Sequence, residues 1–387
     1  MTGSSPGRGG HPVDLDDAAA VTAADPGGML LEIASSAAQV RSAATAAAEA
    51  GVGTLADDGR PRAVLVCGMG GSGVAGELLA AVAGLGAGAP VLTHRGYGLP
   101  AWVGAADLVV AVSCTGRTEE TLSALGEAVR RGCRLLVVGA ADSPLAALGE
   151  RGRAVVVPVP PGREPRASVW SLTVPLVLAG AALGLLQTGA EEVEEAAQVL
   201  ERVATRCRPD ADTTVNPAKL LATELSGALP MVWGSSALAG AAAHRFACQL
   251  NENAGGVALW GTLPEAGHNQ VVALDGAWAG GSGGAGEDDL FRDRVDEPER
   301  PQLRLVLLRD LDEHPRVARR ADVCVDLAGE RGTGVSQLQA EGTGALARLA
   351  GLIATTDLAS AYLALLEGTD PTPVDAVTVL KQRIGPA

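Results

Sequence analysis

The chain has 387 residues, of which 47% are hydrophobic and only 2% aromatic, with 51 glycines and a formal net charge of −15. This length and apolar content predict two or three domains with a buried core, and exclude a disordered chain, a small disulfide scaffold and a coiled coil. The acidic balance argues against nucleic acid or an anionic membrane as a partner, because clustered Lys and Arg would be needed to bind them.

Cysteine usage and the chain start predict a cytoplasmic protein. The six cysteines lie at irregular spacings with no CxxC pair, which is typical of reduced, mostly buried thiols. The N-terminal residues lack the basic start and apolar run of a signal peptide. One apolar run, Ser168–Gln187, approaches membrane-spanning length, but it contains Pro175, Gly180 and Gly184. We expect this run to form a buried helix and no membrane span.

The first half of the chain has the pattern of one α/β lobe. Residues 1–27 are predicted to be a flexible tail, and residues 28–190 a lobe that opens with a helix over Met29–Ala50. Short apolar runs alternate with helical stretches, and they predict strands at Arg62–Cys67, Pro90–Thr93, Asp107–Ser113, Cys133–Gly139 and Arg153–Pro158. This alternation is the pattern of a doubly wound parallel sheet flanked by helices.

A second α/β lobe is predicted over residues 191–350. Its expected strands are Leu229–Gly234, Gln270–Leu274, Leu303–Leu308 and Asp322–Leu327. A Gly-rich, then charged stretch near residues 279–300 is interpreted as a mobile surface insertion. Residues 351–387 complete the C-terminal helices, predicted at Thr343–Glu367 and Val374–Arg383. The fold class is therefore α/β, with two such lobes in tandem.

A glycine-rich motif, Gly68-Met-Gly-Gly-Ser-Gly73, joins the first strand to a helix. Glycines here let the backbone approach an anion, and the helix N-terminus supplies free N–H groups. A dinucleotide site would also need an acid at the end of the second strand, where the sequence has Val91-Leu-Thr-His-Arg95. No Lys-Ser/Thr follows the glycines, so the motif is not a P-loop. A turn that only packs helix on sheet remains the alternative.

A second loop rich in hydroxyl groups follows the third strand and reads Ser113-Cys-Thr-Gly-Arg-Thr-Glu-Glu-Thr121. Hydroxyls at a helix N-terminus beside a glycine turn form a set of neutral donors suited to a phosphate monoester. The alternative is a capping box, in which Thr118 and Thr121 only start a helix.

These motifs resemble those of the sugar isomerase (SIS) domain, specifically of the bifunctional phosphoglucose/phosphomannose isomerase family. The resemblance rests on the two loops above and on further motifs that occur in family order, namely Pro165-Arg166, Asn251-Glu-Asn253, Pro264-Glu-Ala-Gly-His-Asn269, and Asp370-Pro-Thr-Pro373 with Lys381. It covers nearly the whole chain from about residue 55. It implies two SIS lobes, a homodimer with active sites near the interface, and a small sugar phosphate as substrate.

The resemblance also implies roles for single residues. Those that would hold the sugar phosphate are Gly70, Gly71, Ser72, Ser113, Thr115 and Thr118. Glu252 would be the base that moves a proton between C1 and C2, and Arg166 would stabilise the enediolate. His268 would assist ring opening, from its own chain or from a partner subunit. Additional groups at the site would be Lys381, Thr372 and Arg117.

The chemistry of an aldose–ketose isomerase explains these residue types. A positioned Glu can take and return a weakly acidic C–H proton, and Arg supplies fixed positive charge where the enediolate develops. A His suits protonation of the ring oxygen near neutral pH. The reaction needs no metal and no redox cofactor.

The sequence departs from the family pattern at four positions. Thr115 replaces a serine and Arg117 an asparagine, Gly255 stands where a lysine is common, and Gln270 replaces a common Glu. These departures bear on substrate preference and leave the proposed proton-transfer groups intact.

The sequence thus predicts an isomerase that interconverts glucose 6-phosphate or mannose 6-phosphate with fructose 6-phosphate through a cis-enediol(ate). One rival is a non-catalytic SIS-type protein that only binds or senses a sugar phosphate. A second rival is an NADP-dependent oxidoreductase in which Arg95 contacts the 2′-phosphate.

Overall fold

A computed structural model of the protein describes residues 11–280 and 301–385. The chain divides into two compact units, each with one parallel sheet. The first-lobe unit contains Met29–Thr205 and Glu341–Ala354, and the second-lobe unit contains the residues before Met29, Arg206–Ala340 and the chain from Thr355 onward. Almost all of the acidic helix that follows Gly189 belongs to the first-lobe unit, whereas the sequence predicts this helix in the second lobe.

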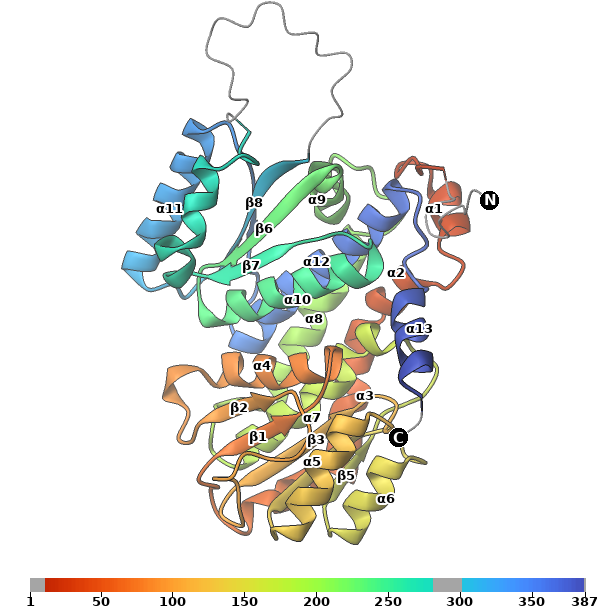
Figure 1. The fold of residues 1–387 in the computed structure, drawn as a ribbon, viewed down its shortest axis with the longest axis vertical. Coiled ribbons are helices and arrows are strands. Elements are labelled where there is room, and N and C mark those ends of the chain that lie inside the picture. The colour runs from red at the N-terminus through yellow and green to blue at the C-terminus, as the bar shows by residue number, and fades with distance from the viewer. Residues whose placement is uncertain (1–10, 281–300, 386–387) are drawn as a thin grey trace, which may run out of the picture. The chain divides into compact units, whose positions relative to one another are not determined.

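The first-lobe unit is built on five parallel strands in the order β2-β1-β3-β4-β5 (Figure 1). Every residue of the central strands β1 and β3 is buried, so both faces of the sheet must be covered by helices. The strands are β1 (Val64–Cys67), β2 (Val91–His94), β3 (Leu108–Ser113), β4 (Arg134–Gly139) and β5 (Val155–Pro158).

Two helical layers cover this sheet. Helices α5 and α6 contribute Leu125 and Leu145 to the core on one face, whereas α3, α4 and α7 pack together on the other. The helices are α2 (Met29–Ala34), α3 (Ser36–Glu49), α4 (Gly71–Ala83), α5 (Glu119–Arg130), α6 (Pro144–Arg151), α7 (Val169–Ala182) and α8 (Ala190–Arg206). The prediction of a doubly wound parallel sheet is confirmed.

The apolar run at Ser168–Gln187 forms α7, which is a core helix as predicted. Trp170, Leu172 and Leu176 on it are fully buried, and α3 and α4 pack beside it. Among the described residues, one helix, α12 (Ala345–Leu366), is long and apolar enough to cross a membrane, but 94% of its most apolar window is buried inside the protein.

The second-lobe unit has four parallel strands in the order β7-β6-β8-β9. Helix α11 covers one face, where Ala321, Cys324 and Ala328 meet Trp233 and Leu305, and α10 packs on the other. The strands are β6 (Ala228–Gly234), β7 (Leu259–Thr262), β8 (Gln302–Arg309) and β9 (Gly334–Gln339). The helices are α1 (Ala18–Ala24), α9 (Pro217–Leu225), α10 (Ala237–Asn253), α11 (Pro315–Glu330), the later part of α12, and α13 (Asp375–Ile384).

Two strands predicted in this unit are wrong. Residues Gln270–Asp275 form a 3₁₀ helix, η5, and the predicted strand Asp322–Leu327 lies within α11. The short apolar run within Asp322–Leu327 resembles a strand, but the buried residues of α11 recur at spacings of three and four, which is the period of a helix. The strands that complete the sheet are β7 and β9, whose side chains are partly exposed because both lie at sheet edges.

The expectation of a flexible N-terminal tail is wrong for the described residues before Met29. Asp17 caps α1, and Leu15 and Val21 are buried. The fully buried ammonium of Lys219 donates to the carbonyl of Leu15 at 2.5 Å, which fastens this segment to its unit. The greater part of the predicted Gly-rich insertion, residues 281–300, lies outside the described residues.

Candidate active site

The glycine-rich loop connects β1 to α4 at the carboxyl edge of the first sheet. Gly70 precedes the helix with φ of +53°, a conformation that favours glycine. A side chain at Gly73 would lie 2.7 Å from the carbonyl oxygen of Gly68, so the loop is closed too tightly for any other residue. No side chain caps α4 at Gly70, and an anion could therefore bind at this helix end.

The hydroxyl-rich loop between β3 and α5 meets the glycine loop directly. Ser113 Oγ and Thr118 Oγ1 are 2.9 Å apart, and the Gly116 N–H donates to Ser113 Oγ at 3.0 Å. The Cys114 N–H donates to Ser72 Oγ at 3.4 Å, and the residue Ser72 is 8% exposed. Because β1 and β3 are neighbours where the strand order reverses, the two loops line the crevice where doubly wound folds bind ligands.

The capping-box alternative does not describe Thr118. Thr118 is the N-cap residue of α5, but its side chain makes no capping hydrogen bond and instead contacts Ser113. The hydroxyl is therefore directed into the loop and is not used by the helix. Thr115 and Arg117 are exposed on the same loop, and the Arg117 N–H donates to Thr115 Oγ1 at 3.3 Å.

Arg166 lies against the glycine loop from a third segment of the same unit. It belongs to the 3₁₀ helix η3 (Pro165–Ala167) and is 3% exposed. A Cβ at Gly71 would be 3.7 Å from the Arg166 Cα, so the two backbones are in close approach. Arg166 pairs with Glu164 at 3.1 Å. The structure therefore brings Gly70, Gly71, Ser72, Ser113, Thr118 and Arg166 into one region of the first-lobe unit.

Cys114 in this region is a residue that sequence reasoning passed over. Burial raises the pKa of the Cys114 thiol above its ordinary value. A protonated thiol leaves this region without an added negative charge, which suits an anion site.

Glu252 lies in the second-lobe unit, near the C-terminal end of α10. Its neighbour Asn253 is buried and donates to Ser360 Oγ of α12 at 2.9 Å. Two turns earlier, Arg245 forms a buried ion pair with Asp357 at 2.6 Å. This buried polar set holds α10 on α12, and no sequence pattern had pointed to it.

His268 lies elsewhere in the same unit. It is exposed in the 3₁₀ helix η4 (Glu265–His268), which packs through Ala266 on the sheet face covered by α11. Glu252 lies on the opposite face, because α10 packs there with Gly240 against Thr262. Glu252 is twelve positions after Gly240 on α10, which corresponds to about 18 Å at 1.5 Å per residue. The helix runs over this distance towards the amino edge of the sheet. Within one chain, Glu252 and His268 are thus held apart.

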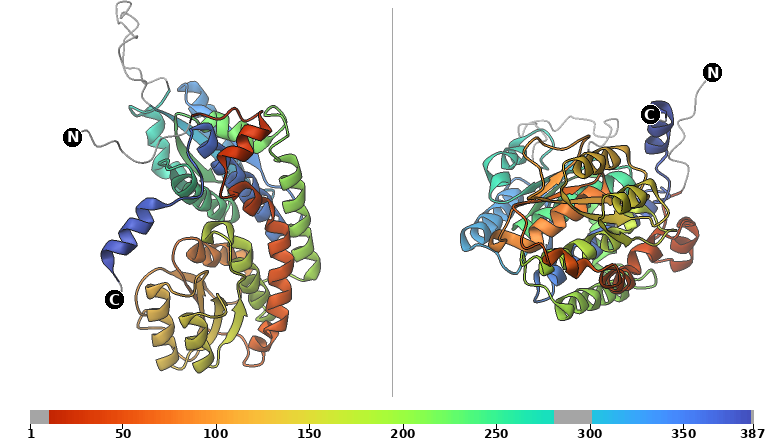
Figure 2. Two further views of the ribbon diagram at one scale, coloured as in Figure 1. Left: turned by 90° about the vertical axis from the view of Figure 1, so that its right-hand side faces the viewer. Right: turned by 90° about the horizontal axis from the view of Figure 1, so that it is seen from below.

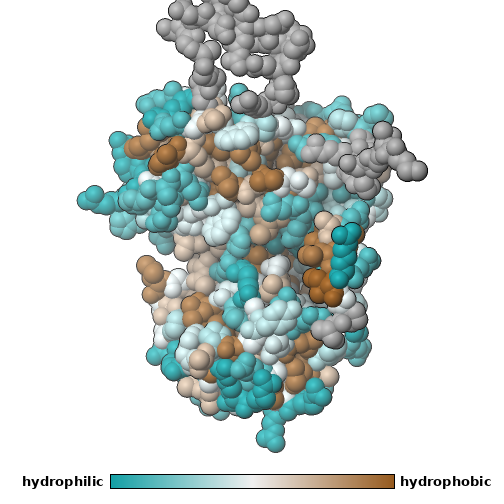
Figure 3. Space-filling view, in the orientation of Figure 1, coloured by the Kyte–Doolittle hydropathy of each residue, from teal (hydrophilic) through white to brown (hydrophobic). Residues whose placement is uncertain are grey.

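The two C-terminal candidates lie on and before α13. Lys381 is exposed on this helix, which has no buried residue. Thr372 packs against Gly27, where a Cβ would be 2.1 Å from Thr372 Oγ1. Figure 3 shows apolar and polar surface side by side at α13, and Leu380 and Ile384 are 59% and 70% exposed. In Figure 2, α13 projects from the other elements of its unit.

The residue on which the oxidoreductase alternative rests, Arg95, is engaged in an ion pair within its own lobe. Arg95, the expected 2′-phosphate contact, pairs with Glu77 of α4 at 2.6 Å.

No three His, Cys, Asp or Glu side chains within the described ranges are grouped so that they could hold a metal ion.

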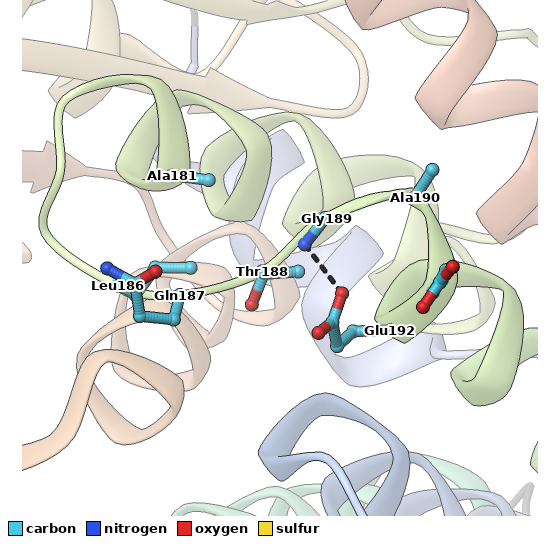
Figure 4. Close-up of a pocket in the computed structure, with 8 residues that line it drawn as sticks. Ala181, Leu186, Gln187, Thr188, Gly189, Ala190 and Glu192 are labelled. Carbon is cyan, nitrogen blue, oxygen red and sulfur yellow. Dashed lines mark hydrogen bonds between the residues drawn. The ribbon is translucent and has the colours of Figure 1, made fainter.

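A depression of about 490 Å³ lies away from these residues, between α7 and α8 (Figure 4). Its wall includes Glu191 and Glu192, and the Gly189 N–H donates to Glu192 Oε2 at 2.7 Å. The acidic lining does not suit an anion, so this depression takes no part in the candidate site.

Comparison with known proteins gives sequence relatives over most of the chain. A family model described as the bacterial phospho-glucose isomerase C-terminal SIS domain matches residues 214–384. A bifunctional phosphoglucose/phosphomannose isomerase of Caldicellulosiruptor bescii is 31% identical over 326 residues, which cover 83% of this chain and 89% of the relative. The protein of the same name from Aquifex aeolicus is 29% identical over 325 residues, 84% of this chain and 90% of its own.

The fold is also found among solved structures. A hypothetical protein from Thermus thermophilus superimposes with a TM-score of 0.66 at 17% identity, covering 96% of this chain and 95% of that one. At this identity the likeness concerns the fold, and it confirms the predicted α/β architecture with two lobes.

Proposed function

Because the chain belongs to the bifunctional phosphoglucose/phosphomannose isomerase family, we propose that it interconverts glucose 6-phosphate and/or mannose 6-phosphate with fructose 6-phosphate. The observation that carries the proposal is the meeting of two hydroxyl-bearing loops and Arg166 at the crevice of the first sheet. This chain has the groups to bind a phosphate monoester there without a lysine.

The substrate phosphate binds between the two loops. Backbone N–H groups at the start of α4 and the hydroxyls of Ser72, Ser113 and Thr118 donate to its oxygens. Thr115 and Arg117, which are exposed on the same loop, complete the contact. Neutral donors explain how a chain with a net charge of −15 binds a small anion.

Proton transfer is the task of Glu252. Its carboxylate removes the proton from C2 of the aldose and returns it to C1, while the proton of the C2 hydroxyl passes to O1, so that a cis-enediolate is the intermediate and no atom is gained or lost. Arg166 stabilises the negative charge that develops on the enediolate oxygens. The buried pairs Arg245–Asp357 and Asn253–Ser360 fix α10 on α12 and hold the base in place.

Ring opening requires His268, and its position supports a site shared by two copies of the chain. His268 and Glu252 lie on opposite faces of one sheet, which makes it difficult for a single chain to present both to one hexose. A homodimer in which the partner subunit supplies the histidine removes this difficulty. Lys381 and Thr372 belong to the C-terminal segment that completes the site.

The test is a coupled assay that offers the purified protein glucose 6-phosphate and mannose 6-phosphate side by side. The proposal expects turnover of at least one of them to fructose 6-phosphate. A folded protein that is stabilised by hexose phosphates but converts neither would instead be the non-catalytic binding protein.

A further inference from the structure

Gln39 is a buried polar residue on a helix whose other buried side chains are small and, apart from Ser36, apolar. It is 2% exposed on α3, where Ala37, Val40, Ala43 and Ala47 are also buried. Burying an amide is costly unless its hydrogen bonds are made, so its contacts indicate what it is for. Gln39 Nε2 donates to the carbonyl of Ala167 at 2.8 Å, directly after Arg166.

A second side chain holds the other end of the same short segment. Glu32 Oε2, on α2, accepts a hydrogen bond from the Glu164 N–H at 2.9 Å. Arg163 adds a third tie, because its guanidinium donates to Ser35 Oγ at 2.5 Å. The backbone of η3 is thus bound to α2 and α3 on both sides of Arg166.

The opposite side of η3 touches the glycine loop. A Cβ at Gly71 would lie 3.4 Å from the carbonyl oxygen of Pro165. The segment is therefore held between the start of α4 and the two helices α2 and α3. A backbone held on both sides leaves Arg166 little freedom relative to the proposed phosphate site.

We infer that Gln39 and Glu32 are positioning residues for Arg166, which set the place of its guanidinium where the enediolate charge develops. The inference rests on the proposed function, because it takes Arg166 to act in the transition state. Misplacement of such a group by about 1 Å can cost as much as two orders of magnitude in rate.

The experiment is a double-mutant cycle between Gln39→Met and Arg166→Met. Methionine keeps the length of the side chain and removes the donor to Ala167. Gln39→Met is expected to lower kcat about tenfold and leave KM within about twofold, because the lost interaction acts in the transition state. In the Arg166→Met background the same change should have no further effect on kcat.

Ser171→Ala is the matched control. It removes the hydroxyl that contacts Gln39 Oε1 at 3.3 Å and leaves the Ala167 bond in place, so kcat should stay near the wild-type value. Glu32→Gln, which keeps an acceptor for the Glu164 N–H, should retain activity, whereas Glu32→Ala should lose it. The comparison of Glu32→Gln with Glu32→Ala tests the positioning role if Gln39→Met does not fold.

The outcomes separate the inference from the function on which it rests. If Arg166→Met lowers kcat while Gln39→Met and Glu32→Ala do not, the positioning role is overturned and the isomerase stands. Equal losses from Gln39→Met with and without Arg166 would show a purely structural role and also overturn it. If Arg166→Met itself leaves kcat unchanged, both the role of Arg166 and the inference fail.

Discussion

Single residues in the loop after β3 carry the proposed anion site. The Thr118 hydroxyl is 2.9 Å from Ser113 Oγ and does not cap its own helix. A hydroxyl that is not used for capping is available to a phosphate oxygen. This geometry distinguishes a binding loop from an ordinary helix start, and the sequence alone is compatible with both.

Replacing Thr118 tests this point. Thr118→Val keeps the shape and removes the hydroxyl, and it should raise KM for the hexose phosphate by at least about tenfold, since a hydrogen bond to a charged group contributes roughly 1.5–3 kcal/mol. Thr118→Ser keeps the donor and should stay within about twofold of wild type. Steady-state kinetics on both variants is the measurement, and equal KM increases in the two would contradict a hydroxyl contact.

The two loops of the candidate site are visible in the sequence because each is a short run of glycine or hydroxyl residues directly after a strand. The roles of Gln39 and Glu32 could not be predicted from the sequence, since they lie more than 120 residues before the segment that they hold. The same limit applies to Asn253 and Ser360, which are 107 positions apart. Long-range hydrogen bonds of this kind leave no local spacing signal.

Among the elements, α12 begins at a cap supplied by another helix. Glu195 of α8 accepts hydrogen bonds from the N–H groups of Thr343 and Gly344, at 2.6 and 3.0 Å. These bonds, the Thr343 N–H first, hold the pKa of the Glu195 carboxyl below its ordinary value. A carboxylate at a helix N-terminus is also favoured by the helix dipole.

Glu195→Gln should therefore lower the free energy of unfolding by about 1 kcal/mol at pH 7. Because the folded pKa is depressed, the contribution of Glu195 is fully present above the unfolded pKa of about 4.3 and is lost as the pH falls through the folded value. The measurement is urea unfolding of Glu195→Gln and of the wild type, at pH 7 and at a pH below the folded pKa of Glu195. Glu191→Gln, an exposed site on the same helix, serves as control. A difference between Glu195→Gln and wild type that persists unchanged at low pH would contradict the charge-based cap.

The central strands β1, β3 and β4 of the first sheet follow from the sequence because they are buried apolar runs. The second sheet is harder, since its edge strands β7 and β9 bury few side chains and have weak apolar patterns. The apolar residues of Gln270–Asp275 and of α11 imitate strands at short range. The helical period of α11 becomes clear only over its full length, and the run Asp322–Leu327 is too short to show it.

At the scale of the whole molecule, the separation of Glu252 and His268 predicts that two chains build one site. Glu252→Gln and His268→Ala proteins should each be nearly inactive alone. After unfolding and joint refolding at equal amounts, half of the dimers would be mixed and each would have one intact site. Activity should then recover to roughly a quarter of wild type, given a two-fold symmetric dimer. No recovery, with mixed dimers confirmed by mass, would mean that one chain supplies both groups.

The acidic surface and the scarcity of lysine also fit a substrate of this size. A formal charge of −15 repels extended polyanions, whereas the proposed site offers a single phosphate local donors at a helix end. Lys381 is one of two lysines in the chain, and the other, Lys219, is fully buried.

The proposed isomerase moves a proton between two carbons of a hexose phosphate with Glu252 as the base. Fructose 6-phosphate incubated in D2O with the wild-type protein should gain deuterium at C2 of the aldose product, as read by NMR. Glu252→Gln should bind the sugar phosphate with little loss of affinity and incorporate no deuterium. Deuterium incorporation by Glu252→Gln at the wild-type rate would contradict the assignment of the base.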